Sequence, residues 1–325
     1  MTSETWQVNG PESIDVGLVR RVRANLMGGS VNVVAHDDAS CRVEVDGLTG
    51  RDLKVELDGD TLTIDHPQLD WQQFGTSVRT LVDSPSAEVY VLVPRRCDVN
   101  VKATSAEVLV AGVEGEVSIS TVSGEQFADQ TGGTLALSSV SGNVTAREHA
   151  GRVDAKTTTG DITVSGTLLE YTGNTVSGSA VVDLLDAGTR QFTHNTVSGR
   201  ATVRLAAGTN PSYNIQTVTA TTHIGDDTID PLHGRRHREQ ATGDGDSLFL
   251  RLNSVAGSIT VVEAETNEPA ASAAHRVDDS PVDFSNAPKV QRVNEPEAQA
   301  AREPRSEGER PDVTGFRTAT GTEES

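Results

Sequence analysis

A tetrapeptide with an 18-residue period restricts the fold of this 325-residue chain more than any other feature. Its commonest form is Ser/Thr-Val-Ser-Gly, with Thr157-Thr158-Thr159-Gly160 as one variant. The step is constant up to Gly178 and lengthens by three positions for the next two copies. A repeat this short indicates a chain assembled from copies of one small unit. The copies end, in order, at Ala106, Gly124, Gly142, Gly160, Gly178, Gly199, Ala220 and, after an insertion, Gly257.

A second period of nine residues lies inside the first. Glycines recur every nine residues from Gly115 to Gly160, and apolar residues follow two and four positions later, as Val117 and Ile119 do after Gly115. This alternation is the period of a strand with one buried face. Each nine-residue unit is therefore predicted to be a strand and a turn.

Two such units make a flattened coil with two strands facing each other across a thin core. A single unit cannot bury its apolar face, but coils stacked about 4.8 Å apart let each strand hydrogen-bond its copy in the next coil. An antiparallel meander is the competing topology. The 18-residue spacing favours the coil, because alternate units resemble each other more than neighbours do. We therefore predict an all-β solenoid with 18-residue coils.

The tetrapeptide is predicted to form a corner of each coil. Glycine suits either a left-handed backbone or a close approach of two coils. Stacked serine and threonine hydroxyls can satisfy the amides and carbonyls of the turns. The corner residues expected to have this structural role are Gly124, Gly142, Gly160, Gly178, Gly199, Ser123, Ser141, Ser177 and Ser198.

The flanks are less regular than the repeats. We expect a flexible N-terminus at 1–11 and a solenoid at 12–262. A disordered acidic tail, rich in Glu, Pro, Ala and Ser, is expected at 263–325. A loop at 66–86, containing Trp71 and Phe74, should interrupt the first coils. Within the solenoid the predicted parts are irregular first coils and cap at 12–102, regular repeats at 103–225, a loop insertion at 226–246 and a last coil at 247–262.

Charge and cysteine content narrow the possible partners. The formal net charge of −20 argues against nucleic acid, whose phosphates require clustered lysine and arginine. Cys41 and Cys97 are too few for a disulfide framework, so we expect two solitary, partly buried thiols, which could pair only in an exported protein. No segment has a signal-peptide pattern or approaches the roughly 20 apolar residues that span a bilayer. A cytoplasmic location is the expectation.

No pattern in the sequence indicates catalysis, a cofactor or a metal site. The serines of the corners would need a base, and neither His149 nor His194 recurs with them. The acidic positions one coil apart are mixed with other residues, which is typical of a solvated face. These columns are Glu125, Asn143, Asp161 and Ser179 in one case and Glu116, Thr134 and Arg152 in the other. The histidines His223, His233 and His237 match no zinc spacing, and Gly243 to Asp246 is a single imperfect copy of a calcium turn.

The Thr-Val-Ser-Gly corners and the Gly-x-Val-x-Val strands that follow them resemble a bacterial β-strand-repeat family. The family is labelled "putative adhesin" and is also called the toastrack domain. The resemblance covers residues 12 to 262 and is most specific from Ala106 to Ala220. It implies a right-handed parallel β-solenoid of unassigned function and a connection with envelope-stress modules. The family supplies no catalytic or binding residues to transfer to this sequence.

Three functions remain after these observations. The first is a non-enzymatic scaffold or protein-interaction module with a protein partner, which the repeat and the absence of a recognisable site favour. The second is an exported cell-surface adhesin, and the third is a carbohydrate-active β-helix enzyme. The sequence identifies neither the partner nor the oligomeric state.

Overall fold

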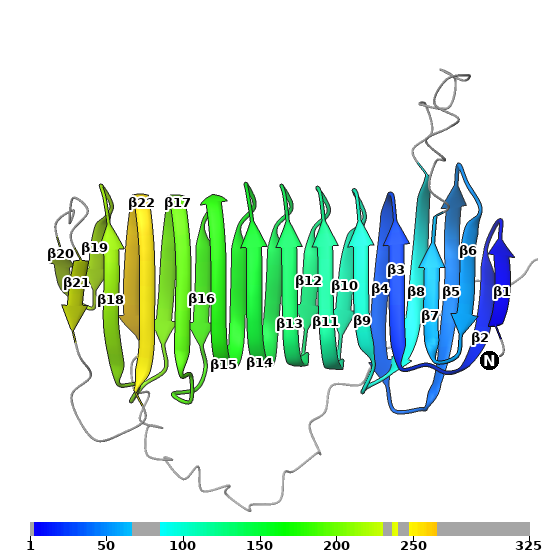
Figure 1. Cartoon of the computed structure of the whole chain (residues 1–325), viewed down its shortest axis with the longest axis horizontal. Helices are drawn as coiled ribbons and strands as arrows, with labels where there is room; N and C mark the ends of the chain where they lie inside the picture. Colours follow the sequence, from blue (N-terminus) through cyan, green and yellow to red (C-terminus); the bar gives the residue numbers. More distant parts are fainter. Residues whose placement is uncertain (1–2, 67–84, 230–235, 240–246, 265–325) are drawn as a thin grey trace, which may run out of the picture. The chain divides into compact units, whose positions relative to one another are not determined.

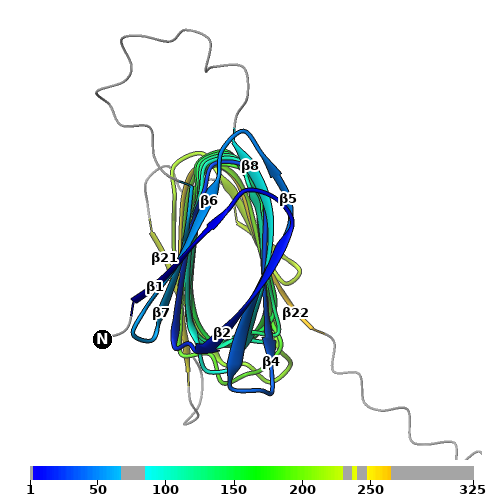
Figure 2. The ribbon, with the colours of Figure 1, turned by 90° about the vertical axis from the view of Figure 1, so that its right-hand side faces the viewer.

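The computed structural model describes residues 3–66, 85–229, 236–239 and 247–264, and within these ranges every regular element is a β-strand. The strands form two walls that face each other and are joined at corners, as the view along the stack shows (Figure 2). The chain passes from one wall to the other in each coil, and the coils follow one another along the stack (Figure 1). The predicted all-β architecture is therefore confirmed.

The first wall contains, in stacking order, β1 (Ser3–Val8), β6 (Leu53–Asp58), β7 (Thr61–Asp65), β3 (Arg21–Leu26), β9 (Asp98–Ala103), β11 (Glu114–Thr121), β13 (Gly132–Ser139), the second halves of β14 (Val144–Thr157) and β15 (Ile162–Ser177), the first halves of β17 (Gln191–Leu205) and β22 (Leu248–Glu263), β18 (Pro211–Thr217) and β21 (Arg236–Glu239). The second wall contains β2 (Glu12–Leu18), β5 (Ser40–Thr49), β8 (Ser86–Pro94), β4 (Gly29–His36), β10 (Glu107–Ala111), β12 (Gln126–Asp129), the first halves of β14 and β15, β16 (Ala180–Leu184), the second halves of β17 and β22, β19 (Thr221–Ile224) and β20 (Asp227–Ile229).

The middle of the stack follows the 18-residue repeat. Val117 of β11 pairs in parallel with Leu135 of β13, which pairs in turn with Val153 of β14. Where the repeat lengthens, the extra residues fall outside the strands and Tyr171 still pairs with Phe192. Equivalent residues of successive coils therefore form straight columns along the stack.

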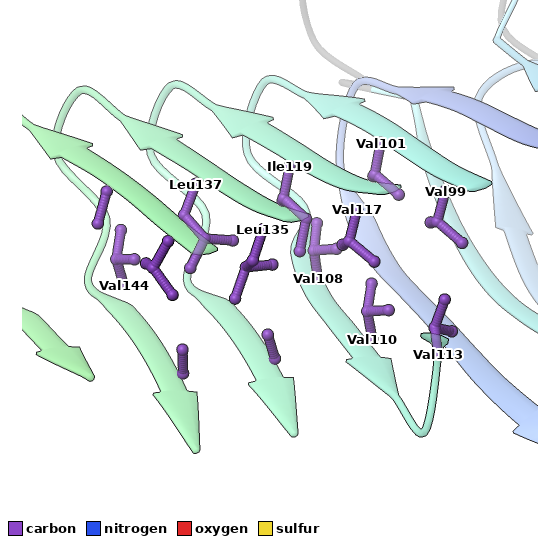
Figure 3. Packing of buried hydrophobic residues seen from close by; sticks show 14 of the residues in the cluster. Val99, Val101, Val108, Val110, Val113, Val117, Ile119, Leu135, Leu137 and Val144 are labelled. Carbon is purple, nitrogen blue, oxygen red and sulfur yellow. The ribbon is translucent and has the colours of Figure 1, made fainter. Parts of the chain in front are cut away.

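The core lies between the two walls and consists mainly of valine, leucine, isoleucine and alanine. Inward positions alternate with outward ones along each strand, so that Val117, Ile119, Leu135 and Leu137 are fully buried (Figure 3). Because successive coils place side chains of similar size in the same column, aliphatic side chains fill most of the narrow space.

The corners use close approach rather than a left-handed backbone at most of the predicted glycines. A Cβ on Gly142 would lie 2.0 Å from the carbonyl oxygen of Gly124, and one on Gly160 would lie 2.0 Å from that of Gly142. Of the five predicted corner glycines, Gly178 alone has a positive φ, of 156°. The glycines therefore permit the tight spacing of neighbouring corners.

Hydroxyl groups satisfy the corner backbone in two ways. Outward serines reach back one coil, since Ser123 Oγ donates to the Thr104 carbonyl at 3.3 Å and Ser141 Oγ to the Val122 carbonyl at 3.1 Å. The buried first residue of the tetrapeptide acts within its own corner, where Ser139 Oγ accepts a hydrogen bond from the Gly142 amide at 2.7 Å. At Ser177 the backbone amide makes the link to the preceding coil, while Ser198 lies in register with Ser177.

The N-terminal end differs from the prediction in two respects. Residues 3–8, expected to be flexible, form β1 and pair antiparallel with β6, with Val8 fully buried. The order of the first strands in space also differs from their order in the chain, because β3 lies between β7 and β9 and β4 lies between β8 and β10. Antiparallel β1 and β2 cover the end of the stack instead, where parallel coils would leave an open edge.

The predicted last coil is not at the end of the stack. β22 lies between β17 on one side and β18 with β19 on the other. Its corner glycine, Gly257, stacks on Gly199, where a Cβ would lie 1.9 Å from the carbonyl oxygen. The predicted loop at 226–246 contains β20 and β21, which pair antiparallel with β19 and β18 and cover this end. Most of the predicted loop at 66–86 and most of the predicted tail at 263–325 lie outside the described residues. The same holds for Trp71, Phe74, His233 and the segment from Gly243 to Asp246.

Both cysteines are free thiols, and at 1% exposed they are fully rather than partly buried. Burial raises the pKa of the Cys41 and Cys97 thiols to about 12. We expect alkylation by iodoacetamide at pH 8 to proceed only as fast as the chain opens, because the reactive thiolate is both scarce and shielded. Mass spectrometry with and without denaturant measures this. Rapid labelling of the folded protein would contradict the burial.

Candidate interaction surface

A row of exposed valines follows one corner of the stack. The second residue of the corner tetrapeptide points outward in each coil, while the residue before it is buried. These valines are between 43% and 50% exposed. We call this column the valine ridge; in stacking order its members are Val122, Val140, Thr158, Val176, Val197, Val255 and Val218.

Half of the large hydrophobic side chains that the described residues expose belong to this ridge: six of twelve. Single exposed valines are ordinary, but a row of valines interrupted only at Thr158 is typical of a contact surface. The sequence contained the signal, since a valine recurs between polar residues of the corner. The third-position serine and the glycine of each corner were assigned roles from the sequence, whereas the valine before them was missed.

A groove of about 760 Å³ runs beside the ridge. Its floor contains the buried hydroxyl column, for example Thr157 and Thr196, which are 5% and 4% exposed. Its far bank is the last outward column of the first wall: Ser138, Lys156, Asn174, Asn195, Asn253 and Gln216. The groove is therefore apolar on one side, hydroxyl-lined beneath and rich in amides on the other side.

The amides of the far bank bond to one another along the stack. Asn195 Nδ2 donates to Asn174 Oδ1 at 2.9 Å, and Asn253 Nδ2 donates to Asn195 Oδ1 at 2.7 Å. The ladder crosses from β17 to β22, whose Asn253 is 58 residues later in the sequence than Asn195, and so supports the register of that coil.

Replacing Asn195 by alanine removes both bonds of the ladder at its centre. We expect the free energy of unfolding to fall by about 1–2 kcal/mol, the cost of two partly exposed hydrogen bonds. Chemical denaturation measures the loss. Asn100→Ala, at an outward position of β9 away from the ladder, is the matched control, and equal losses in both variants would contradict a specific role.

The charge of the surface differs from that of the chain. Among the described residues that line the groove, Lys156 is the one charged residue and there is no acid, in a chain with a net charge of −20. Lys156 Nζ lies 2.8 Å from Asp154 Oδ2 on the same wall, and both side chains are about half exposed. The surface therefore presents little negative charge to a partner.

Aromatic and histidine side chains fill the core directly beneath the amide ladder. The rings of Tyr171 and Phe192 stack with centroids 4.6 Å apart, and His194 Nδ1 lies 3.4 Å from the Tyr171 hydroxyl. Burial lowers the pKa of His194 to about 4 and raises that of Tyr171. Gly173 leaves room for this group, since a Cβ there would lie 2.2 Å from the Tyr171 hydroxyl.

The histidines considered as bases for the corner serines have other partners. His149 Nδ1 lies 2.9 Å from the Thr131 hydroxyl, and burial lowers the pKa of His149. His194 is beside Tyr171 in the core. The structure therefore brings neither histidine into a hydrogen bond with Ser123, Ser141, Ser177 or Ser198 among the bonds of the described residues.

The two acidic columns lie where the repeat predicts them. Asn143 Nδ2 donates to Glu125 Oε1 at 3.3 Å, the Asp161 amide donates to Asn143 Oδ1 at 3.1 Å, and the Ser179 amide donates to Asp161 Oδ1 at 2.7 Å. This column therefore stabilises successive turns. Glu116, Thr134 and Arg152 are likewise in register with one another.

The described ranges contain no group of three or more His, Cys, Asp or Glu arranged to hold a metal ion. His223 Nδ1 instead lies 3.1 Å from the Thr228 hydroxyl, and His237 Nε2 lies 3.7 Å from Glu239. Over the same ranges, no helix is long and apolar enough to cross a membrane.

Comparison with solved structures gives distant likenesses. A "putative lipid binding protein" from Parabacteroides distasonis ATCC 8503 is 16% identical, with a TM-score of 0.43 over 78% of this chain and 97% of that one. A "putative adhesin" from the same organism is 12% identical, with a TM-score of 0.41 over 81% and 97%. A "putative adhesin" from Bacteroides fragilis NCTC 9343 is 10% identical, with a TM-score of 0.38 over 80% and 97%.

No curated protein matches the sequence. A family model does match: the one described as Toastrack DUF4097 covers residues 20–261, which include the strands from β3 to most of β22. The resemblance inferred from the Thr-Val-Ser-Gly corners is therefore confirmed, and the chain belongs to the Toastrack DUF4097 family.

Proposed function

We propose that this chain is a non-enzymatic interaction scaffold, built as a right-handed β-solenoid, that binds a protein partner along the valine ridge and its groove. The ridge carries the proposal. Six exposed valines in one column are costly to keep in water, and the corner uses its two hydroxyl residues and its glycine rather than the side chain of the valine.

The surroundings of the ridge support the same role. Hydrogen bonds along the stack hold the asparagines of the amide bank, and a valine has few rotamers to lose, so little side-chain freedom is lost when a partner binds. The serines and glycines are occupied by corner contacts, which leaves the valine and the amide column as the groups that face outward.

Photo-crosslinking in cells tests the proposal. A benzophenone amino acid at Val197 should give a discrete protein adduct, identified by mass spectrometry. The same group at Thr163, exposed on the second wall, is the control. Equal adducts at the two positions, or none at Val197, would contradict a contact role for the ridge.

A further inference from the structure

We infer that the partner of the valine ridge is a second copy of this chain, with two stacks side by side and parallel about a two-fold axis along the stack. The inference rests on the proposed function and names the partner. Three observations lead to it: the adjacency of ridge and groove, the distribution of charge on the two sides of the ridge, and the matched heights of the charged residues.

Ridge and groove are neighbouring columns, and the groove extends along six of the seven coils that contribute to the ridge. Val140, Val176 and Val197 line the groove as well as forming the ridge. A two-fold axis along the stack places each ridge in the groove of the other copy, so one operation makes both contacts. The valines of each copy would then pack against the hydroxyl floor and the valines of the other.

Electrostatics restrict where two such chains can meet. Two copies with a net charge of −20 repel each other over most of their surfaces. Among the described residues, the groove has no acid in its lining and includes Lys156. Contact between copies is therefore least unfavourable at this surface.

The charged residues on the two sides of the ridge select the direction of packing. Within one coil, Lys156 precedes the ridge member Thr158 and Asp161 follows it; Lys102 and Glu107 have the same relation to Thr104, one coil before the first valine of the ridge. In the parallel arrangement the lysine side of one copy faces the acidic side of the other at the same height. An antiparallel arrangement over the eight coils from β9 to β18 would place Glu107 opposite Thr221 and Asp161 opposite Ser179, so neither lysine would face an acid.

The contact is small. Eight coils from β9 to β18 span about 34 Å at about 4.8 Å per coil, and the walls are about 10 Å apart. A strip of this size covers a few hundred Å² per copy, the range of weak and reversible interfaces. We therefore expect association at roughly ten to several hundred micromolar protein.

Sedimentation velocity of the full chain over this concentration range tests the inference. The wild type should shift reversibly from monomer to dimer, and Val176→Asp with Val197→Asp should remain monomeric. Thr145→Asp with Thr163→Asp adds the same charge on the second wall and should dimerise like the wild type. Circular dichroism verifies that each variant is folded.

Charge exchange tests the direction of packing. Lys102→Glu alone and Glu107→Lys alone should each weaken dimerisation about tenfold, a change of about 1.4 kcal/mol. The two together should restore it, because each lysine again faces an acid. Lys102 and Glu107 are exchanged rather than Lys156 and Asp161, because Asp161 also accepts a hydrogen bond from the Ser179 amide of its own chain.

The outcomes separate this inference from the proposed function. A wild type that stays monomeric at several hundred micromolar, with a crosslink from Val197 to another protein, overturns the dimer and leaves the scaffold function standing. Dimers that the ridge variants do not affect, or that the exchanged charges do not restore, overturn the arrangement. A Val197 adduct containing this chain itself supports it.

Discussion

Gly142→Ala is expected to lower the free energy of unfolding by about 3 kcal/mol or more, because the corner has no room for an added methyl group. The added carbon would lie 2.0 Å from the Gly124 carbonyl oxygen and 2.8 Å from its carbon. Both atoms belong to the backbone of the neighbouring coil, so no side chain can rotate away. The two coils must separate at this corner, which weakens the parallel hydrogen bonds on both sides. Gly142→Val should be more damaging still, since its branched side chain needs more space.

A second glycine serves as the control for this substitution. Nothing lies within 4 Å of the position that a Cβ would take on Gly17, and its φ is not positive, so Gly17→Ala should be neutral or stabilise by up to about 1 kcal/mol. Urea denaturation followed by circular dichroism measures both variants. If Gly142→Ala were as stable as Gly17→Ala, the glycine column would not set the coil spacing.

Acidification from pH 6.5 to pH 4 is expected to cost the folded state about 3 kcal/mol through His194 alone. Burial lowers the pKa of His194 from 6.5 to about 4, so below pH 6.5 the unfolded chain binds a proton that the folded chain excludes. The stabilisation is complete above pH 6.5 and is lost progressively as the pH falls towards 4. His149, whose pKa burial also lowers, adds an effect of the same sign.

His194→Gln isolates this contribution, because glutamine is neutral and polar at every pH in the range. The unfolding free energy of the variant, measured by denaturation from pH 7.5 to pH 4, should fall less steeply than that of the wild type. Identical slopes for His194→Gln and the wild type would show that His194 is not buried in its neutral form.

The repeats made much of the fold predictable. A glycine at each 18-residue step, with apolar positions two and four places after it, indicated the coil length, the inward side chains and the corners. This was possible because each coil interacts mainly with neighbouring coils of similar sequence. The corner hydroxyls were predictable for the same reason. The contribution of glycine was left open between a left-handed backbone and close approach, since only the distance between neighbouring corners decides it.

Other features depended on contacts that the repeat does not encode. The place of β22 between β17 and β18 follows from the fit of Gly257 on Gly199 and of Asn253 on Asn195, residues 58 positions apart. β1 becomes ordered because β6, far later in the sequence, offers an unpaired edge. The valine ridge was visible in the sequence, but its exposure was not, because an apolar residue in a strand-rich chain is ordinarily assigned to the core.

The insertion of β22 also has a consequence for the order of events during synthesis. Most coils can be added to the growing stack one at a time as they leave the ribosome, since each pairs with the coil made just before it. The coil formed by β18 and β19 cannot, because its partner on the stack is a segment translated after it. Until β22 has emerged, the edge of β17 is without its final neighbour. The closing step therefore joins strands distant in sequence, which is the slow kind of contact in folding.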